Sequence, residues 1–433
     1  MNLSNQISKK ECIIGIIGLG YVGLPLALAF SKSKFKTIGF DVDKSKIENL
    51  KKNISYISSV KNNSIQKTKK FFFPTTNYDK LKQTNIIIVC VPTPIKGSKK
   101  APDLQYVVNV INKLKKVSLK NKLIIFECTS YPGTTEEFLI PVIKEQKLII
   151  GKNIFLGYSP EREDPGNKKF SLEKKNITKI VSGHSKKCLY LVKKLYLNIT
   201  KKIFVVSNIR TAEFTKLLEN IYRSVNIGLV NELSQISDKF KINIFESIKA
   251  AETKPFGYQA FFPGPGVGGH CIPVDPHFLS WKAAQIGMKT KFIELAGSIN
   301  DNRPKLVSNK IINIVKTKNY KIKKILFVGI TYKKNCNDIR MSPVIDVLNF
   351  LQKKIDCEFF LYDIYTKSQK IKTSKKINYL TKKLNKKIMK DFDATIIACN
   401  HDGVDYELIR KESKIIFDLK NTYKKQHNNV VTI

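Results

Sequence analysis

The stretch IIGIIGLGYVGLPLALAFSKSKFKTIGFD, residues 13–41, decides the fold of the first part of the chain. It opens with a β-branched run at residues 13–17, which predicts a buried strand. The Ala- and Leu-rich residues 21–30 predict a helix, and residues 36–40 predict a second strand. A strand, a glycine turn, a helix and a second strand in this order are typical of a parallel α/β sheet.

The turn in this stretch carries a dinucleotide-binding pattern. Gly18, Gly20 and Gly23 form G-x-G-x-x-G, whose glycines let the backbone turn tightly and approach a pyrophosphate at a helix N-terminus. Asp41 ends the second strand, where a carboxylate can accept hydrogen bonds from ribose hydroxyls and repel the extra phosphate of NADP. The pattern therefore predicts NAD as the cofactor. In the alternative interpretation the glycines only pack the helix on the strand, and Asp41 is a solvated strand end.

Strands and helices alternate on both sides of a helical middle. Residues 211–241 have helical periodicity and predict one long helix, and residues 278–300 predict a second helical stretch. Further strands are predicted at residues 85–91, 122–127, 153–156, 324–328, 358–362, 394–398 and 414–417. The fold class is therefore α/β, with two doubly wound Rossmann-like domains joined by a long central helix and a helical middle domain.

Composition excludes several classes of protein. The chain of 433 residues has a formal net charge of +42, but most of this charge is Lys spread along the sequence. A dedicated nucleic-acid binder should use more Arg, so the charge indicates coding bias, with a possible role in attracting an acidic nucleotide substrate. The eight Cys residues include no CxxC pair, so neither a metal site nor a disulfide scaffold is expected.

Neither a signal peptide nor a membrane segment is expected. The N-terminus runs from a polar stretch directly into the first strand, which is not the pattern of a signal peptide. No apolar run approaches the roughly 20 residues needed to span a bilayer. These features predict a cytoplasmic enzyme.

The loop GPGVGGHCIPVDP, residues 264–276, is the chemical centre of the sequence. Its glycines would let the backbone close around a ligand. The thiolate of Cys271 could attack an aldehyde, and loss of a hydride from the adduct would give a thioester that water cleaves. Asp275 could position or deprotonate that water. The alternative for Cys271 is a small buried hydrophobic residue.

Two residues of the long helix form a further candidate pair. Lys216 and Asn220 are four residues apart and therefore share a helix face. An ammonium and a carboxamide aimed at one oxygen would stabilise an alkoxide or a tetrahedral oxyanion. The alternative is a solvated Lys beside a surface Asn.

A series of motifs resembles the UDP-glucose/UDP-N-acetylhexosamine dehydrogenase family over essentially the whole chain. The motifs occur in family order and are GLGYVGLPLA (18–27), FDVDKSKI (40–47), VPTP (91–94), ECTSYPGTT (127–135), YSPEREDPGN (158–167), AEFTKLLENIYRSVNIGLVNE (212–232), PGPGVGGHCIPVDP (263–276) and GITYKKNCNDIRMSP (329–343). The resemblance implies that residues 1–205 form an NAD-binding Rossmann domain, 206–310 a helical central and dimerisation domain with the catalytic cysteine loop, and 311–433 a UDP-binding Rossmann-like domain.

The resemblance also implies roles for individual residues. Cys271 would be the nucleophile, Lys216 and Asn220 would stabilise the oxyanion, and Asp275 and Glu161 would handle water. The implied contacts to the cofactor are Gly18, Gly20, Tyr21, Val22, Gly23, Asp41, Lys46, Thr93, Ser130 and Arg340. The implied contacts to the substrate are Arg162, Phe256, Phe262 with its neighbour Phe261, Gly268, Tyr332 and Lys333. The family uses its long helix to form a dimer, so a homodimer or higher homo-oligomer is expected.

The substrate implied by the resemblance is a UDP-hexose, oxidised at C6 in two successive NAD-dependent steps to supply precursors of surface polysaccharide. The segment EREDPGN and the loop form GGHCIPVDP are more similar to enzymes acting on UDP-N-acetylglucosamine. UDP-glucose and UDP-N-acetylmannosamine remain alternatives. The sequence departs from many relatives at Lys420, which stands where an Arg is common and lacks its planar fork.

Two other functions remain open. A two-electron hydroxy-acid dehydrogenase would share the glycine turn and a helical middle but would need no cysteine. A nucleotide-binding module without turnover would have no need for Lys216, Asn220, Cys271 and Asp275 together.

Overall fold

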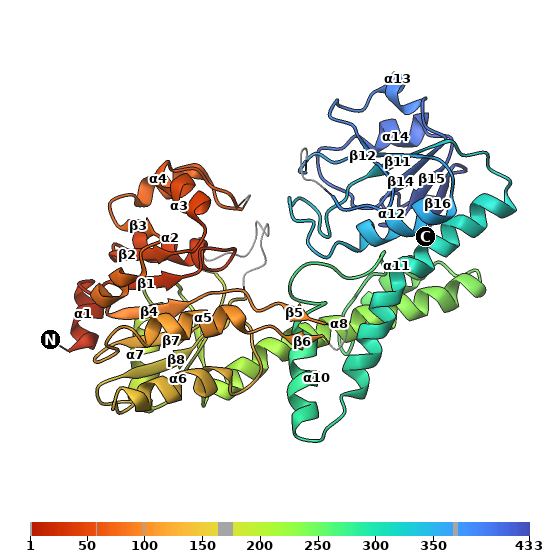
Figure 1. Ribbon diagram of the computed structural model, residues 1–433. Coiled ribbons are helices and arrows are strands. Elements are labelled where there is room, and N and C mark those ends of the chain that lie inside the picture. The colour runs from red at the N-terminus through yellow and green to blue at the C-terminus, as the bar shows by residue number, and fades with distance from the viewer. Residues whose placement is uncertain (1, 58, 98–99, 163–175, 367–370) are drawn as a thin grey trace. The chain divides into compact units, whose positions relative to one another are not determined.

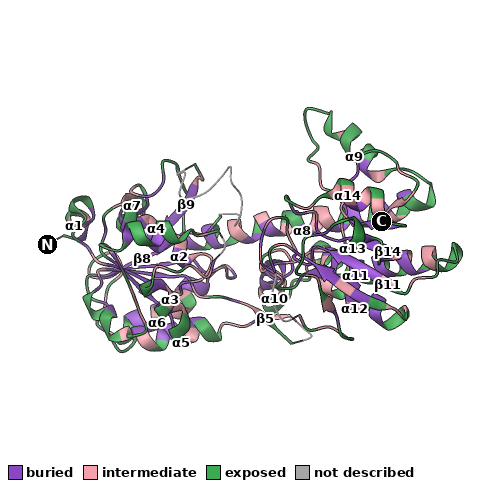
Figure 2. Cartoon of the chain, turned by 90° about the horizontal axis from the view of Figure 1, so that it is seen from above, coloured by how far each residue is buried: buried purple, intermediate pink, exposed green. Residues whose placement is uncertain are grey.

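The computed structural model of the protein describes residues 2–57, 59–97, 100–162, 176–366 and 371–433. The chain forms two compact units. The first comprises Met1–Glu219 and His277–Gly287, and the second comprises Asn220–Pro276 and Met288–Ile433. Figure 1 labels most of the elements, and Figure 2 shows buried residues gathered in the strands of each unit. The expected division into three domains at residues 205 and 310 stays a prediction.

The first unit is built on an eight-stranded sheet in the order β10-β9-β8-β7-β4-β1-β2-β3. Its strands are β1 (Ile14–Ile17), β2 (Thr37–Phe40), β3 (Phe72–Thr75), β4 (Ile86–Val89), β7 (Leu123–Phe126), β8 (Phe155–Tyr158), β9 (Lys179–Gly183) and β10 (Ile203–Val205). All neighbours are parallel except β8 and β9, which are antiparallel. A short antiparallel pair, β5 (Ile95–Lys96) and β6 (Ala101–Pro102), lies outside this sheet.

Helices cover both faces of the first sheet. One face packs against α1 (Leu3–Lys9), α2 (Gly23–Lys32), α3 (Lys44–Lys51), α4 (Asn62–Thr68) and α7 (Lys186–Tyr196). The other packs against α5 (Gln105–Leu114), α6 (Thr134–Glu145) and the start of α8 (Ile209–Lys239). A 3-10 helix, η1 (Tyr78–Gln83), precedes β4.

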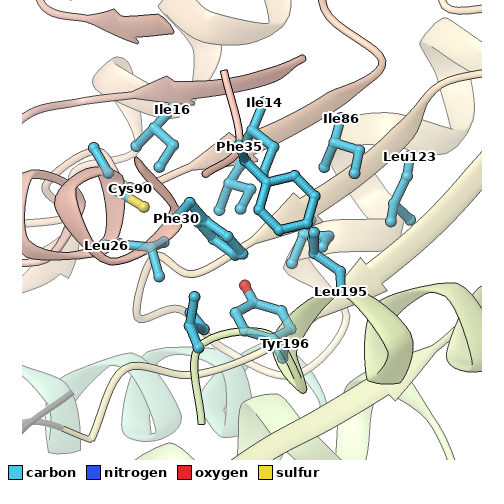
Figure 3. Close-up of a cluster of buried hydrophobic side chains, with 14 of the residues drawn as sticks. Ile14, Ile16, Leu26, Phe30, Phe35, Ile86, Cys90, Leu123, Leu195 and Tyr196 are labelled. Carbon is cyan, nitrogen blue, oxygen red and sulfur yellow. The ribbon is translucent and has the colours of Figure 1, made fainter. Parts of the chain in front are cut away.

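The core of the first face explains why the strands are so uniformly apolar. Figure 3 shows side chains of β1, β4 and β7 meeting those of α2 and α7. The Phe30 ring of α2 packs against Phe35 and Tyr196, with ring centroids 6.0 Å apart in both pairs. Buried side chains on both faces are what a parallel sheet between two helix layers requires.

The second unit contains a six-stranded parallel sheet in the order β13-β12-β11-β14-β15-β16. The strands are β11 (Lys324–Val328), β12 (Glu358–Tyr362), β13 (Asn378–Tyr379), β14 (Ala394–Ile397), β15 (Ile416–Asp418) and β16 (Val430–Thr432). The helices that follow α8 in the chain are α9 (Ile244–Glu252), α10 (Asp275–Gln285), α11 (Lys291–Thr317), α12 (Pro343–Lys354), α13 (Lys386–Met389) and α14 (Tyr406–Glu412). Most of α10 belongs to the first unit. Two buried clusters line the two faces of the sheet.

The predicted α/β class with parallel sheets and a long central helix is confirmed. The predicted single helical stretch at residues 278–300 is wrong, because two helices, α10 and α11, occupy this region and the second continues to Thr317. Gly287 separates them with a φ of +76°, which favours glycine. Helix α11 continues through Pro304 because the next turns bury Val307 and Ile311 in the core of the second unit.

Strand boundaries show smaller differences. The strand expected at residues 153–156 is β8, which begins at Phe155 and ends at Tyr158, and the strand expected at 414–417 is β15. The sequence analysis did not identify β3, β9, β10, β13 and β16. Among the described residues, no helix is long and apolar enough to cross a membrane.

Candidate active site

The glycine turn of the first unit lies between β1 and α2. Gly18 has a φ of +91°, and a Cβ atom there would approach the carbonyl oxygen of Cys90 to 2.7 Å. A Cβ atom on Gly20 would meet no described atom within 4 Å. The N-cap residue of α2 is Val22, and no described side chain accepts a hydrogen bond as its cap. The space beside Gly20 and the uncapped N–H groups fit the pyrophosphate of NAD.

Asp41 and Lys46 lie beside this turn. The Asp41 carboxylate accepts hydrogen bonds from the backbone N–H groups of Leu19 at 2.9 Å and Asp43 at 3.0 Å. The Lys46 ammonium is 3.4 Å from the same carboxylate. Asp41 thus ties the end of β2 to the glycine turn while keeping acceptor capacity for a ribose hydroxyl. The sequence analysis missed Tyr56, whose hydroxyl donates to the carbonyl oxygen of Leu19 at 2.5 Å.

Two predicted cofactor residues lie on loops after neighbouring strands of the first sheet. Thr93, after β4, donates a hydrogen bond from its hydroxyl to the carbonyl oxygen of Thr129 at 2.7 Å. Ser130, after β7, is 1% exposed, and its hydroxyl has no hydrogen-bond partner among the described residues. A buried hydroxyl of this kind is costly unless a ligand satisfies it, which fits the expected contact near the nicotinamide.

Glu161, Arg162 and Lys216 form one cluster in the first unit. The Lys216 ammonium donates to the backbone carbonyl oxygen of Glu161 at 2.6 Å. The Glu161 carboxylate lies 3.0 Å from the ammonium of Lys179, and Arg162 pairs with Glu219 at 2.7 Å. Helix α8 therefore contacts Glu161 and Arg162, and the Lys216 ammonium is directed at Glu161.

Asn220, Cys271 and Asp275 form a second cluster, in the second unit. The Asn220 amide donates a hydrogen bond to the carboxylate of Asp275, which is buried. The backbone N–H of Asp275 donates to the carbonyl oxygen of Cys271 at 2.8 Å. Arg223, which sequence reasoning missed, donates to the other side of the Asn220 amide. Its position three residues after Asn220 on a helix was the available signal.

Cys271 differs from the other thiols of the chain. It is exposed, whereas Cys12, Cys90 and Cys128 are buried. Burial raises the pKa of Cys12 and Cys128 to about 12 and raises that of Cys90 well above its ordinary value. The thiolate is the nucleophilic form, so these three are poor nucleophiles and Cys271 is the better candidate.

The cysteine loop packs closely against the loop after β11. A Cβ atom on Gly268 would lie 2.5 Å from the Cβ atom of Tyr332, and the N–H of Gly269 donates to the carbonyl oxygen of Arg340 at 3.1 Å. The Arg340 guanidinium binds Asp338 with distances of 2.8 and 2.6 Å. The predicted substrate residues Gly268, Tyr332 and Lys333 therefore lie in one region, with Lys333 half-buried. The roles of these three residues in substrate binding stay predictions.

Lys420 lies beside the first glycine of the cysteine loop. Its ammonium would be 3.5 Å from a Cβ atom placed on Gly264. Lys420 is half-buried, and burial lowers the pKa of its ammonium. Such a cation is suited to a phosphate as a point charge, without the bidentate geometry of Arg.

The aromatic residues expected to cover the sugar lie on the surface of the second unit. Phe262 stacks on Phe245 of α9 with ring centroids 6.3 Å apart, and Phe261 contacts Tyr222 at 5.8 Å. Phe256 is 70% exposed. Residues 163–167 of the EREDPGN segment lie outside the described residues. Among described side chains, no group of three or more His, Cys, Asp or Glu is placed to hold a metal.

The chain is similar to known proteins over most of its length. Three parts match the UDP-glucose/GDP-mannose dehydrogenase family, as its NAD binding domain (residues 12–200), central domain (210–302) and UDP binding domain (326–425). Protein CapL of Staphylococcus aureus is 35% identical over 96% of this chain and 97% of its own. The UDP-N-acetyl-D-glucosamine 6-dehydrogenase of Salmonella typhi is 33% identical, covering 97% and 98%. The solved UDP-D-ManNAc dehydrogenase of Pyrococcus horikoshii has a TM-score of 0.85 at 29% identity, covering 97% and 98%.

Proposed function

The chain belongs to the UDP-glucose/GDP-mannose dehydrogenase family, and we propose that it oxidises the C6 hydroxyl of UDP-N-acetylglucosamine to a carboxylate through a cysteine thioester. As a family member it is an NAD-dependent oxidoreductase that acts on the CH–OH group of a UDP-sugar. The observation that carries the proposal is the cluster in which Cys271 is exposed while Asp275 and Asn220 are buried beside it. A two-electron dehydrogenase would need no such cluster.

NAD supplies the acceptor for each hydride when it is bound. The residues that would hold it are those of the glycine turn, with Asp41 at the ribose and Ser130 near the nicotinamide. The open space at Gly20 supports this assignment, as does the buried Ser130 hydroxyl, for which the described part of the chain provides no hydrogen-bond partner. Tyr21, Val22, Lys46, Thr93 and Arg340 complete the proposed contacts.

The first oxidation removes a proton and a hydride from the C6 alcohol and leaves an aldehyde. Lys216 and Asn220 stabilise negative charge on the C6 oxygen as the proton leaves. Lys216 is directed by its bond to the Glu161 carbonyl oxygen, and Asn220 by its bond to Asp275. Donors fixed in advance reorganise little during the reaction, which is the source of their effect on the barrier.

The second oxidation uses the thiolate of Cys271. The sulfur bonds to C6 of the aldehyde, and a second hydride leaves the resulting thiohemiacetal to give a thioester. Water then attacks the thioester carbon, the C–S bond breaks, and the carboxylate leaves as the thiolate is restored. Asp275 and Glu161 position this water and accept its protons. The oxidation consumes two NAD and one water per sugar.

The uridine diphosphate is proposed to bind at Tyr332 and Lys333, with Gly268 and Arg162 contacting the remainder of the substrate and Phe256 and Phe262 covering the sugar. Relatives at similar identity are named for two different sugars, N-acetylglucosamine in Salmonella typhi and N-acetylmannosamine in Pyrococcus horikoshii. The form of the loop, GGHCIPVDP, supports the first. A uronate product would serve as a precursor of surface polysaccharide in the cytoplasm.

The sugar is tested by supplying purified protein and NAD with UDP-N-acetylglucosamine, UDP-N-acetylmannosamine, UDP-N-acetylgalactosamine and UDP-glucose in turn. We expect UDP-N-acetylglucosamine to have the highest kcat/KM, measured from NADH absorbance. A higher value for UDP-N-acetylmannosamine would correct the sugar and leave the reaction unchanged.

The reaction is tested by its stoichiometry and by Cys271→Ser. We expect two NADH per sugar from the wild-type enzyme and no uronate from the variant, because a hydroxyl at this position is a far weaker nucleophile than a thiolate. Cys357→Ser makes the same change at a half-buried thiol of the same unit and should keep full activity. One NADH per sugar, or normal uronate formation by Cys271→Ser, would refute the thioester.

A homodimer is proposed to form through α8. Six large apolar side chains of this helix, together with Phe240 directly after it, are between 42% and 71% exposed, and their spacing of three, four or seven residues places them on one face. They are Phe214, Leu218, Tyr222, Leu229, Leu233, Ile236 and Phe240. An exposed apolar stripe of this length marks a protein interface more often than a solvated surface.

A further inference from the structure

A buried network of charges stands behind Glu161 in the first unit. Lys179, the first residue of β9, is 1% exposed, and its ammonium lies 2.9 Å from a carboxylate oxygen of Glu127 and 3.0 Å from one of Glu161. Glu127 follows β7 and is also buried, and it accepts a hydrogen bond from the hydroxyl of Tyr196 on α7. One cation thus joins two carboxylates that would otherwise repel each other.

The network fixes both oxygens of the Glu161 carboxylate. One oxygen faces the Lys179 ammonium, and the other accepts the backbone N–H of Arg162 at 2.7 Å. The backbone carbonyl oxygen of Glu161 accepts the Lys216 ammonium at 2.6 Å. A change in the position of Glu161 would therefore be transmitted to Lys216, and both residues belong to the proposed chemistry.

The Lys179 ammonium offsets the negative charges of the two buried carboxylates, Glu127 and Glu161. Burial raises the pKa of Glu127, and the charge of Glu161 raises it further, while Lys179 opposes both. Burial alone would lower the pKa of Lys179, but the two carboxylates outweigh this and raise it. The titratable and charged groups that face the network are Glu127 after β7, Cys90 after β4, Tyr196 of α7, Lys216 of α8 and Arg162. Lys179 is the buried cation that contacts both carboxylates directly.

We propose that Lys179 is a positioning residue, which keeps Glu161 ionised and oriented for the water-handling steps and, through the Glu161 carbonyl oxygen, directs Lys216. This inference rests on the proposed function. Without the ammonium, Glu127 and Glu161 would share a proton, as two close carboxylates do. Glu161 would then enter the thioester-cleaving step in the wrong protonation state.

The test compares Lys179→Met with a matched control, Lys122→Met. Lys122 is also buried in the first unit, but its ammonium donates to backbone carbonyl oxygens, including that of Lys82 at 3.2 Å, and contacts no carboxylate in the described structure. Both variants lose a buried ammonium, so both should melt at a lower temperature. For Lys179→Met we expect kcat to fall at least about a hundredfold at neutral pH, with the KM for NAD changed by less than about threefold.

The pH dependence of kcat separates positioning from a merely structural role. If activity requires ionised Glu161, the acidic limb of the profile follows the pKa of this carboxyl. Lys179→Met should raise that pKa and move the limb to higher pH by about one unit or more, whereas Lys122→Met should leave it in place. Lys179→Arg keeps the charge and should restore the wild-type profile.

Glu127→Gln should shift the acidic limb of the kcat profile in the opposite direction to Lys179→Met. This test does not depend on whether Lys179→Met folds. Removing the neighbouring negative charge leaves Lys179 paired with Glu161 alone, so the acidic limb should move to lower pH. An unchanged limb in both Lys179→Met and Glu127→Gln would overturn the positioning role while leaving the proposed function intact. A wild-type protein that oxidises no UDP-sugar would overturn the proposed function and this inference with it.

Discussion

Asp41 and Asp363 occupy equivalent positions, each directly after the strand that follows the first strand of its sheet along the chain. Asp41 follows β2 and accepts the N–H of Leu19 at 2.9 Å, and Asp363 follows β12 and accepts the N–H of Ile330 at 2.8 Å. The difference lies in their remaining partners. Asp363 binds the buried imidazole of His401 at 3.1 Å, whereas Asp41 is approached by a half-exposed Lys46.

These partners explain why the two carboxylates are expected to act differently. Asp363 also accepts the N–H groups of Tyr365 at 2.8 Å and Thr366 at 3.0 Å, so four donors fill its acceptor sites. Asp41 accepts from the N–H of Asp43 on one oxygen and keeps a lone pair there. The first turn can therefore bind a ribose hydroxyl, while the second uses its aspartate to hold its own loop.

Asp41→Asn is predicted to weaken NAD binding. A hydrogen bond between a hydroxyl and a carboxylate contributes about 1.5–3 kcal/mol, so the KM for NAD should rise roughly tenfold to a hundredfold. The preference for NAD over NADP should also narrow, because the charge that repels the extra phosphate is lost. Steady-state kinetics with both cofactors measure the two effects. The sugar-nucleotide KM serves as the internal control, and an equal rise there would show that the variant disrupts the fold instead.

At the scale of elements, Glu213 joins α8 to the start of α6. Its carboxylate accepts the N–H groups of Gly133 and Thr135, the second at 2.9 Å, and the Thr135 hydroxyl at 2.7 Å. The side chain is fully buried. Because Glu213 is three residues before Lys216, the same contact fixes the helix turn that carries a proposed catalytic ammonium.

Stability is predicted to depend on pH through this contact. Burial raises the pKa of Glu213 to about 7, despite its hydrogen bonds. The folded state therefore binds the proton more tightly than the unfolded state, and the stabilisation from protonated Glu213 is lost as pH rises from about 4.5 to about 7. The free energy of unfolding of the wild type, relative to Glu213→Gln, should fall by up to about 3 kcal/mol across this window. Denaturant titrations at several pH values measure the difference, and a constant difference would contradict the assignment.

The apolar face of α8 leads to a prediction about assembly. Leu233→Glu places a charge in the exposed stripe, so it should convert a dimer into a monomer, because an unpaired charge in an apolar interface is costly. Sedimentation velocity would show the change in mass. Glu232→Lys, on an exposed residue of the same helix, is a matched control for altered charge and should leave the mass of the assembly unchanged.

The elements differ in how far their sequences reveal them. Strand β1 and helix α8 were predictable because β-branched runs and helical periodicity are local signals. Strand β9 was not, because its sequence KIVSG is short and includes Lys179, whose burial depends on carboxylates distant in sequence. The break between α10 and α11 at Gly287 was missed although its cause is local. The apolar periodicity on both sides of Gly287 suggested one continuous helix and masked a single left-handed residue.

For the whole molecule, the second sheet repeats the order of six strands of the first, β8-β7-β4-β1-β2-β3. Reading outward from the first strand, β1 is flanked by β2 and β4 in the first sheet, and β11 is flanked by β12 and β14 in the second. In open α/β sheets, ligands bind where the order reverses, at the carboxyl ends of these central strands. The glycine turn, Thr93 and Ser130 follow β1, β4 and β7 at that edge, and Tyr332 follows β11.

The candidate site could be predicted only in part at this scale. Cys271, Asp275 and the glycine turn could be proposed as site residues because their motifs are contiguous in the sequence. The bond from Asn220 to Asp275 joins α8 to the first residue of α10, 55 residues later. The Lys179 network joins residues at the ends of three strands, so neither arrangement follows from local sequence pattern. Such contacts depend on tertiary packing, which no window of sequence contains.

The net charge of +42 leads to a final prediction about substrate capture. A UDP-sugar is an anion, and a protein of strongly positive charge raises the local concentration of anions around it. The value of kcat/KM should fall about threefold or more between low and high salt, because the Debye length shrinks from about 30 Å at 0.01 M to about 3 Å at 1 M. Sucrose at matched osmolality should have little effect. A value that does not change with salt would show that the lysine excess reflects coding bias alone, with no part in binding.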